Sequence, residues 1–180
     1  RYLHVKFRRQ RQMCIRDRTI CGLIYDGITT KELDEFSAGH CATFFKEDPD
    51  YLILASRIAI NNHHKNTSAN FLDIMKKLNK GGIVSDFIIE LVSENEEIIN
   101  SIIDYEKDYL ITYFGFKSLE KSYLLKINNV VVERPQHLFM RVALAIHGHD
   151  IDMVKKVYES LSNKYYICLL YTSPSPRDLR

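Results

Sequence analysis

The sequence is poor in cysteine and has no apolar run long enough to cross a bilayer. Of its four cysteines, Cys14 and Cys168 lie near the two ends, so only Cys21 and Cys41 remain in the body of the chain. These two are about twenty residues apart and form no CxxC motif, which argues against a zinc site and against a disulfide framework. The most apolar stretch, residues 51–60, contains an arginine and is half the length of a membrane helix. We therefore expect a reduced, cytoplasmic protein that does not enter a membrane.

Motifs for the common catalytic chemistries are also missing. No GxxxxGK[ST], GxGxxG or GxSxG pattern occurs, so a phosphate-binding loop and a hydrolase nucleophile have no support. The seven histidines form no HExxH and no Cys/His quartet. His63 and His64 are adjacent and point to different faces of a helix, and His147 and His149 lie at a helix C-terminus, where histidine is electrostatically favoured. The sequence therefore predicts no catalytic residue and no metal ligand.

The two ends differ in charge and composition from the body. The net charge is +2, but residues 1–18 carry +6 and residues 169–180 carry +1, so residues 19–168 carry −5. The strings "QMCIRDR" and "CLLYTSPSPRD" look like translated sequencing-adapter segments; a basic arm and a proline-rich linker are the alternatives. We expect 1–18 and 168–180 to be non-native and exclude them from the fold prediction. The acidic body offers no basic face for nucleic acid.

The body of the sequence predicts a succession of short helices. Thr29 followed by Glu32 forms a capping box, which makes Thr29 the N-cap of the first helix. Asp48 is the expected N-cap of the second helix, with Pro49 at its first position, where the missing N–H costs nothing. This second helix is apolar on almost every side, so we expect it to be buried.

Three further helices are predicted before residue 110. Apolar residues at helical spacing over 71–78 predict one helix, and the glycine pair 81–82 ends it. Ser85 and Ser93 are expected to cap two short helices. The second of these carries four isoleucines on one stripe: Ile98, Ile99, Ile102 and Ile103. The charged run 94–108 is typical of a solvated helix face.

A hairpin interrupts the helices. Residues 122–133 contain two β-branched, apolar runs joined by Asn128 and Asn129, which predicts a type I′ turn because asparagine tolerates positive φ. Pro135 then begins a helix that a glycine ends, and Asp150 opens the last helix. A lone hairpin needs a cover, so its apolar side should pack on helices or on a partner. The predicted fold is mainly α with one β-hairpin.

One pair of residues has the arrangement of a binding site. Thr30 and Asp34 are four residues apart near the start of a capped helix, so they share a face. A hydroxyl and a carboxylate there can hold the polar groups of a nucleotide, while the helix N-terminus attracts phosphate. The alternative is a helix end with a solvated acid.

Two long stretches resemble one enzyme family. The segment "GITTKELDEFSAGHCATFFKEDPDYLILASRIAINNHHK" resembles the end of the ATP-cone, and the helix after it, in the large subunit of class I ribonucleotide reductase. The segment "YFGFKSLEKSYLLKINNVVVERPQHLFMRVALAIHGHDID" is similar to the N-terminal helical region of that subunit. The resemblance implies that residues 19–66 are the C-terminal part of an ATP-cone and that residues 67–167 are a helical N-terminal domain containing the hairpin.

The resemblance also implies an activity and partners for the parent enzyme. Members of the family reduce ribonucleoside diphosphates to deoxyribonucleotides through a thiyl radical, which is generated by long-range transfer from a metal-containing small subunit. A cysteine pair supplies the reducing equivalents, and thioredoxin or glutaredoxin restores that pair. Large subunits associate with one another, and the ATP-cone binds ATP or dATP as an allosteric effector. The effector-contacting Thr and Asp of the family's "TTxELD" motif correspond to Thr30 and Asp34. On this resemblance the chain holds regulatory and scaffold parts, with no catalytic residue and no cofactor of its own.

The chain departs from the family at both ends. The basic, glycine-containing effector motif should precede residue 19, and the catalytic thiols should follow the helix that ends near Tyr166. Two alternatives therefore stay open. A free-standing ATP-cone regulator predicts a DNA-binding module, for which the body offers neither a zinc ribbon nor a basic face. A helical interaction module without a ligand predicts no change in thermal stability on addition of ATP or dATP.

Overall fold

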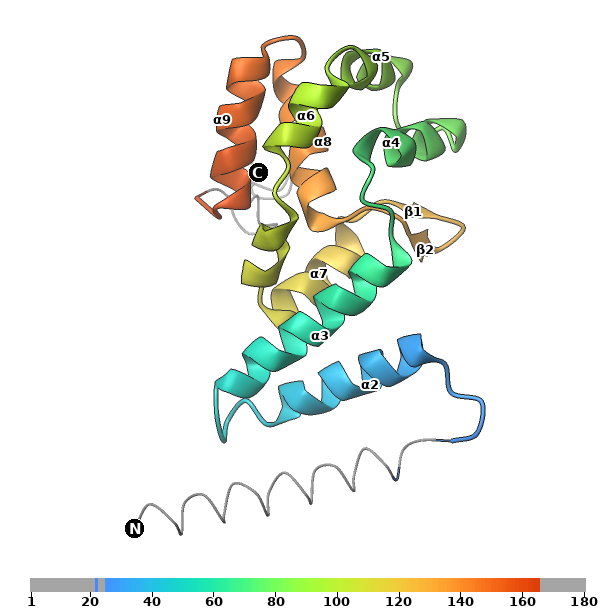
Figure 1. Cartoon of the computed structure of the whole chain (residues 1–180), viewed down its shortest axis with the longest axis vertical. Helices are drawn as coiled ribbons and strands as arrows, with labels where there is room; N and C mark the ends of the chain where they lie inside the picture. Colours follow the sequence, from blue (N-terminus) through green and yellow to red (C-terminus); the bar gives the residue numbers. More distant parts are fainter. Residues whose placement is uncertain (1–21, 23–24, 166–180) are drawn as a thin grey trace, which may run out of the picture. The chain divides into compact units, whose positions relative to one another are not determined.

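The computed structural model describes Gly22 and residues 25–165 of the 180-residue chain. The expected non-native segments 1–18 and 168–180, and with them Cys14 and Cys168, lie outside the described residues, as does Cys21. Within the described part the chain forms eight α-helices, one 3-10 helix and one two-stranded hairpin (Figure 1). They are α2 (Thr30–Thr43), α3 (Asp50–Asn66), α4 (Phe71–Lys80), α5 (Asp86–Glu94), α6 (Glu96–Ile102), η1 (Tyr105–Leu110), α7 (Tyr113–Ser122), β1 (Lys126–Ile127), β2 (Val130–Val131), α8 (Pro135–His147) and α9 (Ile151–Ser162). The predicted mainly-α fold with one hairpin is confirmed.

The chain divides into two compact units. The first contains the described residues up to Lys65 together with Ile111–Lys117, and the second contains Asn66–Leu110 and the chain from Ser118 onward. This division falls beside the predicted boundary between residues 66 and 67. The assignment of residues 19–66 to an ATP-cone remains a prediction.

In the first unit, local side-chain caps set the starts of α2 and α3. The Thr29 hydroxyl accepts the N–H of Glu32 at 3.2 Å, and the Glu32 carboxylate accepts the N–H of Thr29 at 2.9 Å, which confirms the capping box. The helix α3 begins at Asp50, one residue later than predicted, and the Asp48 carboxylate accepts the N–H of Asp50 at 3.0 Å. Asp48 therefore has its predicted role at a slightly shifted boundary.

The prediction that α3 is buried is confirmed on one side of the helix only. Ile53 is 51% exposed, and Leu54 and Arg57 are also exposed. The buried side of α3 is a single stripe: Ala55, Ser56, Ala59, Ile60, Asn62 and His63. Apolar composition shows that a helix can be buried, but the number of sides covered depends on what packs against it.

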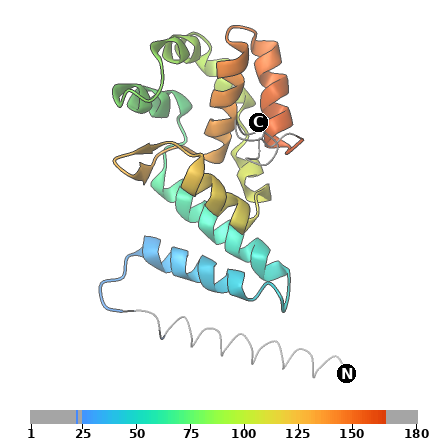
Figure 2. The same ribbon diagram turned by 180° about the vertical axis from the view of Figure 1, so that it is seen from behind.

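The second unit is built around one hydrophobic core. Its helices contribute the following buried side chains: Phe71, Leu72, Ile74, Met75 and Leu78 of α4, Ile88, Leu91 and Val92 of α5, Ile99 of α6 and Ile103 after it, Met140, Ala143 and Leu144 of α8, and Val154 and Tyr158 of α9. The helices α8 and α9 pack side by side, as both views show (Figure 1, Figure 2). The predicted helix over 71–78 is confirmed, and Gly82, at φ +69°, follows its end.

The region between α4 and η1 differs from prediction in three places. Ser85 is the N-cap of α5 as expected, but Ser93 lies inside α5, and Asn95 is the N-cap of α6. Ile98 is half-exposed, so the buried stripe of isoleucines is narrower than predicted. The run 94–108 is not uniformly solvated, because Asp108 is fully buried. Charge counting fails there because the carboxylate has a buried hydrogen-bond partner.

The hairpin is present but shorter than predicted. Lys126 pairs with Val131 and Ile127 with Val130 in an antiparallel ladder. Asn128 and Asn129 have φ values of +50° and +64°, as the type I′ prediction requires. The residues before the hairpin up to Ser122 instead form α7, a helix that sequence reasoning missed. After the hairpin, α8 starts at Pro135 and α9 is capped by Asp150, both as predicted.

Candidate functional site

The predicted effector residues lie on α2, in the first unit. Thr30 is the exposed first residue of the helix, and Asp34 follows one turn later. The Asp34 carboxylate accepts a hydrogen bond from the Lys65 ammonium of α3 at 3.0 Å, and the same contact is an ion pair. Asp34 is thus a paired surface acid, and a ligand bound there would meet a cation as well as a carboxylate.

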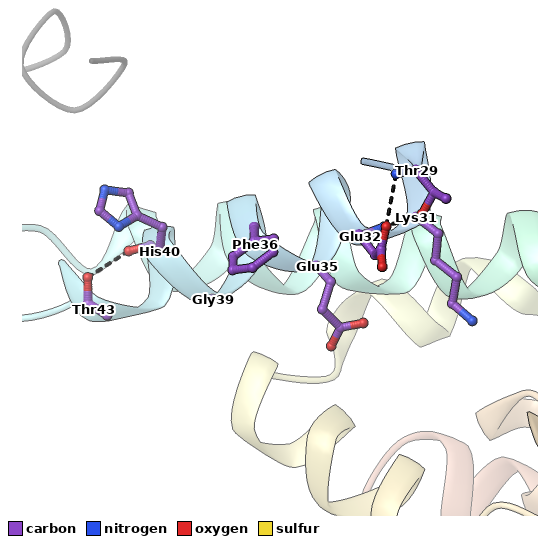
Figure 3. A pocket seen from close by; sticks show the side chains of 8 residues that line it. All are labelled: Thr29, Lys31, Glu32, Glu35, Phe36, Gly39, His40 and Thr43. Carbon is purple, nitrogen blue, oxygen red and sulfur yellow. Dashed lines mark hydrogen bonds between the residues drawn. The ribbon is translucent and has the colours of Figure 1, made fainter. Parts of the chain in front are cut away.

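A groove runs along a different side of α2. Its walls are formed by Thr29, Lys31, Glu32, Glu35, Phe36, Gly39, His40 and Thr43 (Figure 3). At 3.6 residues per turn, Asp34 lies almost opposite Phe36 around the helix axis, and Thr30 lies well away from it. The structure therefore brings Thr30 and Asp34 to one helix end but does not place them in this groove.

The groove combines one apolar surface with several polar groups. The groove contains the half-exposed ring of Phe36, the Lys31 ammonium and the Glu35 carboxylate, and Glu35 forms an ion pair with Lys117. The Glu32 carboxylate accepts hydrogen bonds from the N–H and the hydroxyl of Thr29. Both bonds lower the pKa of Glu32, and the bond from the N–H has the larger effect. Such an arrangement can hold a polar ligand, and it contains no nucleophile with an adjacent base.

His40 is the least satisfied polar group of this groove. Its Nε2 atom is buried and has no hydrogen-bond partner within the part of the chain that the structure describes. The imidazole packs edge-on against the ring of Phe44, at 4.9 Å between centroids. The side chain as a whole is only half-buried, so it marks the groove without defining a ligand.

Sequence reasoning missed a second set of polar residues, at the start of α8 in the second unit. The string Glu-Arg-Pro-Gln-His, residues 133–137, is buried throughout. We call Arg134, Gln136, His137 and their partners Tyr105, Asp108 and Tyr158 the α8 polar cluster. Helical spacing was the available signal, since Gln136 precedes the buried Met140 and Leu144 at intervals of four residues.

Gln136 is the centre of this cluster and uses both ends of its amide. Its Nε2 donates to the Asp108 carboxylate at 3.1 Å. Its Oε1 accepts the hydroxyls of Tyr158 and Ser162, each at 2.8 Å. Burial of the amide is tolerated because its polar atoms have partners.

His137 and Tyr105 form a second chain of hydrogen bonds. His137 Nδ1 accepts the N–H of Arg134 at 3.4 Å, so His137 reaches back to the N-cap as Glu does in a capping box. Its Nε2 lies 2.8 Å from the Tyr105 hydroxyl, and that hydroxyl donates to the Ala69 carbonyl. Because Nδ1 accepts, the ring proton belongs on Nε2, which donates to Tyr105.

Arg134 and Glu133 extend the network in opposite directions. Arg134 donates to the Thr67 hydroxyl at 3.0 Å and to the Thr67 carbonyl at 2.7 Å. Glu133 accepts two hydrogen bonds from Arg141, at 2.7 and 3.3 Å, and one from the N–H of Leu125 at 3.0 Å. Buried charges of this kind are tolerated only when they are paired and hydrogen-bonded.

Burial alters the proton affinity of three groups in the cluster. It raises the pKa of Tyr105 to about 12 and also raises the pKa of Tyr158. It lowers the pKa of the Arg134 guanidinium, against the opposing influence of Tyr105 and Asp108. All three groups keep their ordinary charge at neutral pH, which is typical of structural rather than proton-transferring residues.

The described part of the chain offers no group of histidine, cysteine, aspartate or glutamate side chains suited to a metal ion. None of the described helices is both long and apolar enough to cross a membrane. Cys41, on α2, is the only cysteine among the described residues, and it is half-buried.

Comparison with known proteins shows which proteins the chain is similar to. Residues 109–168 match the family model of the ribonucleotide reductase all-alpha domain. The chain is 46% identical over 161 residues to the ribonucleoside-diphosphate reductase large chain 2 of Saccharomyces cerevisiae, and this match covers 84% of this chain and 18% of the relative. It is 49% identical over 152 residues to the Variola virus large subunit (79% of this chain, 20% of the relative). It is 41% identical over 156 residues to the large subunit of Arabidopsis thaliana (82% of this chain, 19% of the relative).

These matches confirm the resemblance to the ribonucleotide reductase large subunit. The matched family domain includes η1 residues Tyr109 and Leu110, α7, the hairpin, α8 and α9, and therefore most of the α8 polar cluster. The chain spans about a fifth of the length of the curated relatives it matches.

Proposed function

We propose that this chain is a regulatory and scaffold part of a ribonucleoside-diphosphate reductase large subunit. The observation that supports the proposal best is the 46–49% identity to such subunits over about four fifths of the chain. The helical second unit supports it further, because the all-alpha domain model matches the segment that builds most of that unit's α8 polar cluster.

In the proposed parent enzyme, ribonucleoside diphosphates are reduced to deoxyribonucleotides in the cytoplasm. The radical comes from a metal-containing small subunit, and thioredoxin or glutaredoxin returns the reducing equivalents. Large subunits associate with one another. This chain's contribution is structural: the second unit holds a rigid helical core, and the first unit carries the helix whose N-terminus is suited to an anionic effector.

The proposed effector is ATP or dATP, with Thr30 and Asp34 as contact residues. The exposed Thr30 hydroxyl and the N–H groups of Thr30 and Lys31, which precede the first intrahelical hydrogen bond of α2, can meet phosphate or sugar oxygens. Asp34 can accept from a sugar hydroxyl or a base amine, while Lys65, its partner at 3.0 Å, can turn to a phosphate. The pair would thus separate on binding and provide one contact of each sign.

A chimaeric large subunit tests the scaffold part of the proposal. Residues 25–165 would replace the matching segment of the S. cerevisiae relative, and reduction of ribonucleoside diphosphates would be measured with the yeast small subunit. We expect turnover within about tenfold of the parent, because 46% identity generally preserves the buried contacts. A chimaera that folds and assembles but has no activity would contradict the scaffold role.

The same chimaera tests the effector site by calorimetric titration with dATP. We expect Thr30→Val and Asp34→Asn each to weaken binding about tenfold or more, since each removes a hydrogen bond to a charged or strongly polar ligand group. Glu35→Gln is the matched control, because Glu35 is an acid on another side of the same helix and is paired with Lys117. Equal affinity in all three variants would remove the site assignment and leave the scaffold proposal intact.

A further inference from the structure

The chain passes between its two units at three places, once within α7 and twice beside a short connection. The first connector, residues 67–70, follows the passage at Lys65 and leads into α4. The second connector, residues 104–110, contains η1 and precedes the passage at Ile111. Both connectors belong to the second unit, and the α8 polar cluster holds each of them there.

Arg134 anchors the first connector. Its guanidinium donates to both the hydroxyl and the carbonyl of Thr67, at 3.0 and 2.7 Å. The same guanidinium lies 5.0 Å from the centre of the Tyr105 ring, within cation–π range. One buried side chain on α8 therefore contacts the first connector and the first residue of η1.

Gln136 anchors the second connector with help from α9. Its amide donates to the Asp108 carboxylate near the end of that connector. At the other end, the N–H of Asp104 donates to the Tyr158 hydroxyl at 2.9 Å, and that hydroxyl donates to Gln136. The amide of Gln136 thus fixes both ends of the second connector, one directly and one through Tyr158.

Tyr105 ties the two connectors to each other. Its hydroxyl donates to the carbonyl of Ala69 in the first connector and accepts from His137 Nε2. A displacement of the first connector must stretch this bond or carry Tyr105, and with it η1, along. Because Tyr105 is partly buried, water replaces the lost partner only at a cost.

We infer that the first turn of α8 is a clamp that makes the two connectors open and close together, with Tyr105 as the transmitting residue. The clamp gives the second unit a defined response to movement of the chain segment that enters it after α3. This inference stands on contacts within the second unit and does not depend on effector binding by α2. A coupling free energy is reciprocal, so release of either connector should loosen the other.

Hydrogen exchange measured by mass spectrometry on the 180-residue chain tests the coupling. Thr67→Val removes the hydroxyl contact of Arg134 and keeps the side chain's shape. We expect backbone amides to exchange about tenfold faster in residues 67–70 and also in residues 105–110, with little change in α9, because local openings report on the contacts that close them. In a Tyr105→Phe background, the same Thr67→Val change should accelerate residues 67–70 alone.

Two further variants separate coupling from general destabilisation. Arg141→Gln breaks the ion pair between Arg141 of α8 and the buried Glu133 that precedes the helix, and it should not reproduce the paired acceleration. Tyr158→Phe releases the second connector at Asp104 and, by reciprocity, should accelerate residues 67–70 in an otherwise wild-type chain, so the test does not depend on folding of the Tyr105→Phe chain. Two results would overturn the inference. In the first, Thr67→Val has no effect on exchange in residues 105–110. In the second, Arg141→Gln accelerates exchange in the same segments as Thr67→Val.

Discussion

Replacing Gln136 with leucine should destabilise the second unit more than any single change at an exposed position. The side chain is fully buried, and its amide makes three hydrogen bonds: to Asp108, Tyr158 and Ser162. Leucine has similar bulk and cannot make any of them. Gln136→Leu therefore isolates the polar contribution with little change in packing volume.

The magnitude follows from these contacts. The bond to the Asp108 carboxylate contributes about 1.5–3 kcal/mol, and each of the two hydroxyl bonds contributes about 1 kcal/mol. The added apolar burial of leucine offsets roughly 1 kcal/mol of that loss. We expect a net loss of about 3 kcal/mol in the free energy of unfolding. In a chain of this size that corresponds to a decrease in Tm of about 6–12 °C.

Urea unfolding followed by far-UV circular dichroism measures this loss, and helical signal is the appropriate probe because the chain has no tryptophan. Asn100→Leu is the matched control, since it makes the same kind of amide-to-leucine change at an exposed position on α6, where we expect an effect within about 0.5 kcal/mol. A loss of less than about 1 kcal/mol for Gln136→Leu, with an unchanged m value, would refute the role given to the buried amide.

Three further predictions concern pH, a helix cap and the turn. The pKa of Tyr105 is raised to about 12 and that of Tyr158 is also raised, so the stability that these neutral phenols provide is complete below pH 10 and is lost as the pH rises toward 12. Absorbance titration at 295 nm should show tyrosines that ionise late, and the Tyr105→Phe variant should show one fewer of them. Thr29→Ala should accelerate amide exchange in the first turn of α2 by about fivefold. Because the pKa of Glu32 is lowered, the cap's contribution should be present above about pH 4.5 and weaken as the pH falls below it. Equal protection of these amides relative to their intrinsic exchange rates at about pH 4 and pH 7 would speak against the role of Glu32 in the cap. Asn129→Gly should raise stability by about 0.5 kcal/mol in thermal unfolding, because relief of the left-handed conformation at φ +64° exceeds the entropy that glycine adds to the unfolded chain, and Asn129→Val should lower it.

Local signals in the sequence were sufficient wherever a few neighbouring residues decide the structure. The capping box at Thr29, the proline that starts α8 and the positive-φ turn at Asn128 all depend on contacts within four residues. Such features are predictable because backbone sterics and short hydrogen bonds dominate them. The same holds for α4, whose apolar residues follow one clean stripe.

The failures share a different cause, which is packing between distant segments. Residues 113–122 contain a glycine and two phenylalanines among polar residues, and no cap or clean stripe distinguishes the helix α7 that they form. Ser93 is a good N-cap residue, yet α5 continues past it and Asn95 takes that position. Ile98 is apolar and exposed, while Asp108 is charged and buried. In each case long-range contacts overrode a local preference.

In the candidate site, too, features set by neighbouring residues could be predicted and features set by distant contacts could not. The relation of Thr30 to Asp34 follows from helix periodicity and could be predicted, but the pairing of Asp34 with Lys65 joins residues that are distant in the sequence and could not. The groove beside Phe36 and the burial of His40 Nε2 likewise depend on tertiary contacts. Sequence reasoning therefore located the helix of interest and missed what surrounds it.

The α8 polar cluster shows why a helix can begin inside a core on charged and polar residues. A buried helix start must satisfy its unpaired N–H groups, and here Pro135 has none while His137 accepts the one at Arg134. With the backbone satisfied in this way, the side chains of Arg134 and Gln136 are free to bind other segments, and they reach Thr67 and Asp108. The first turn of α8 therefore has two roles: Pro135 and His137 allow the helix to start in the interior, and Arg134 and Gln136 fix the two connectors. Arg134→Ser keeps a good N-cap residue but removes the side chain that binds Thr67. It should preserve helix content by circular dichroism and still release residues 67–70 to exchange. Full protection of residues 67–70 in Arg134→Ser would show that the start of α8 and the anchoring of the first connector are separate roles.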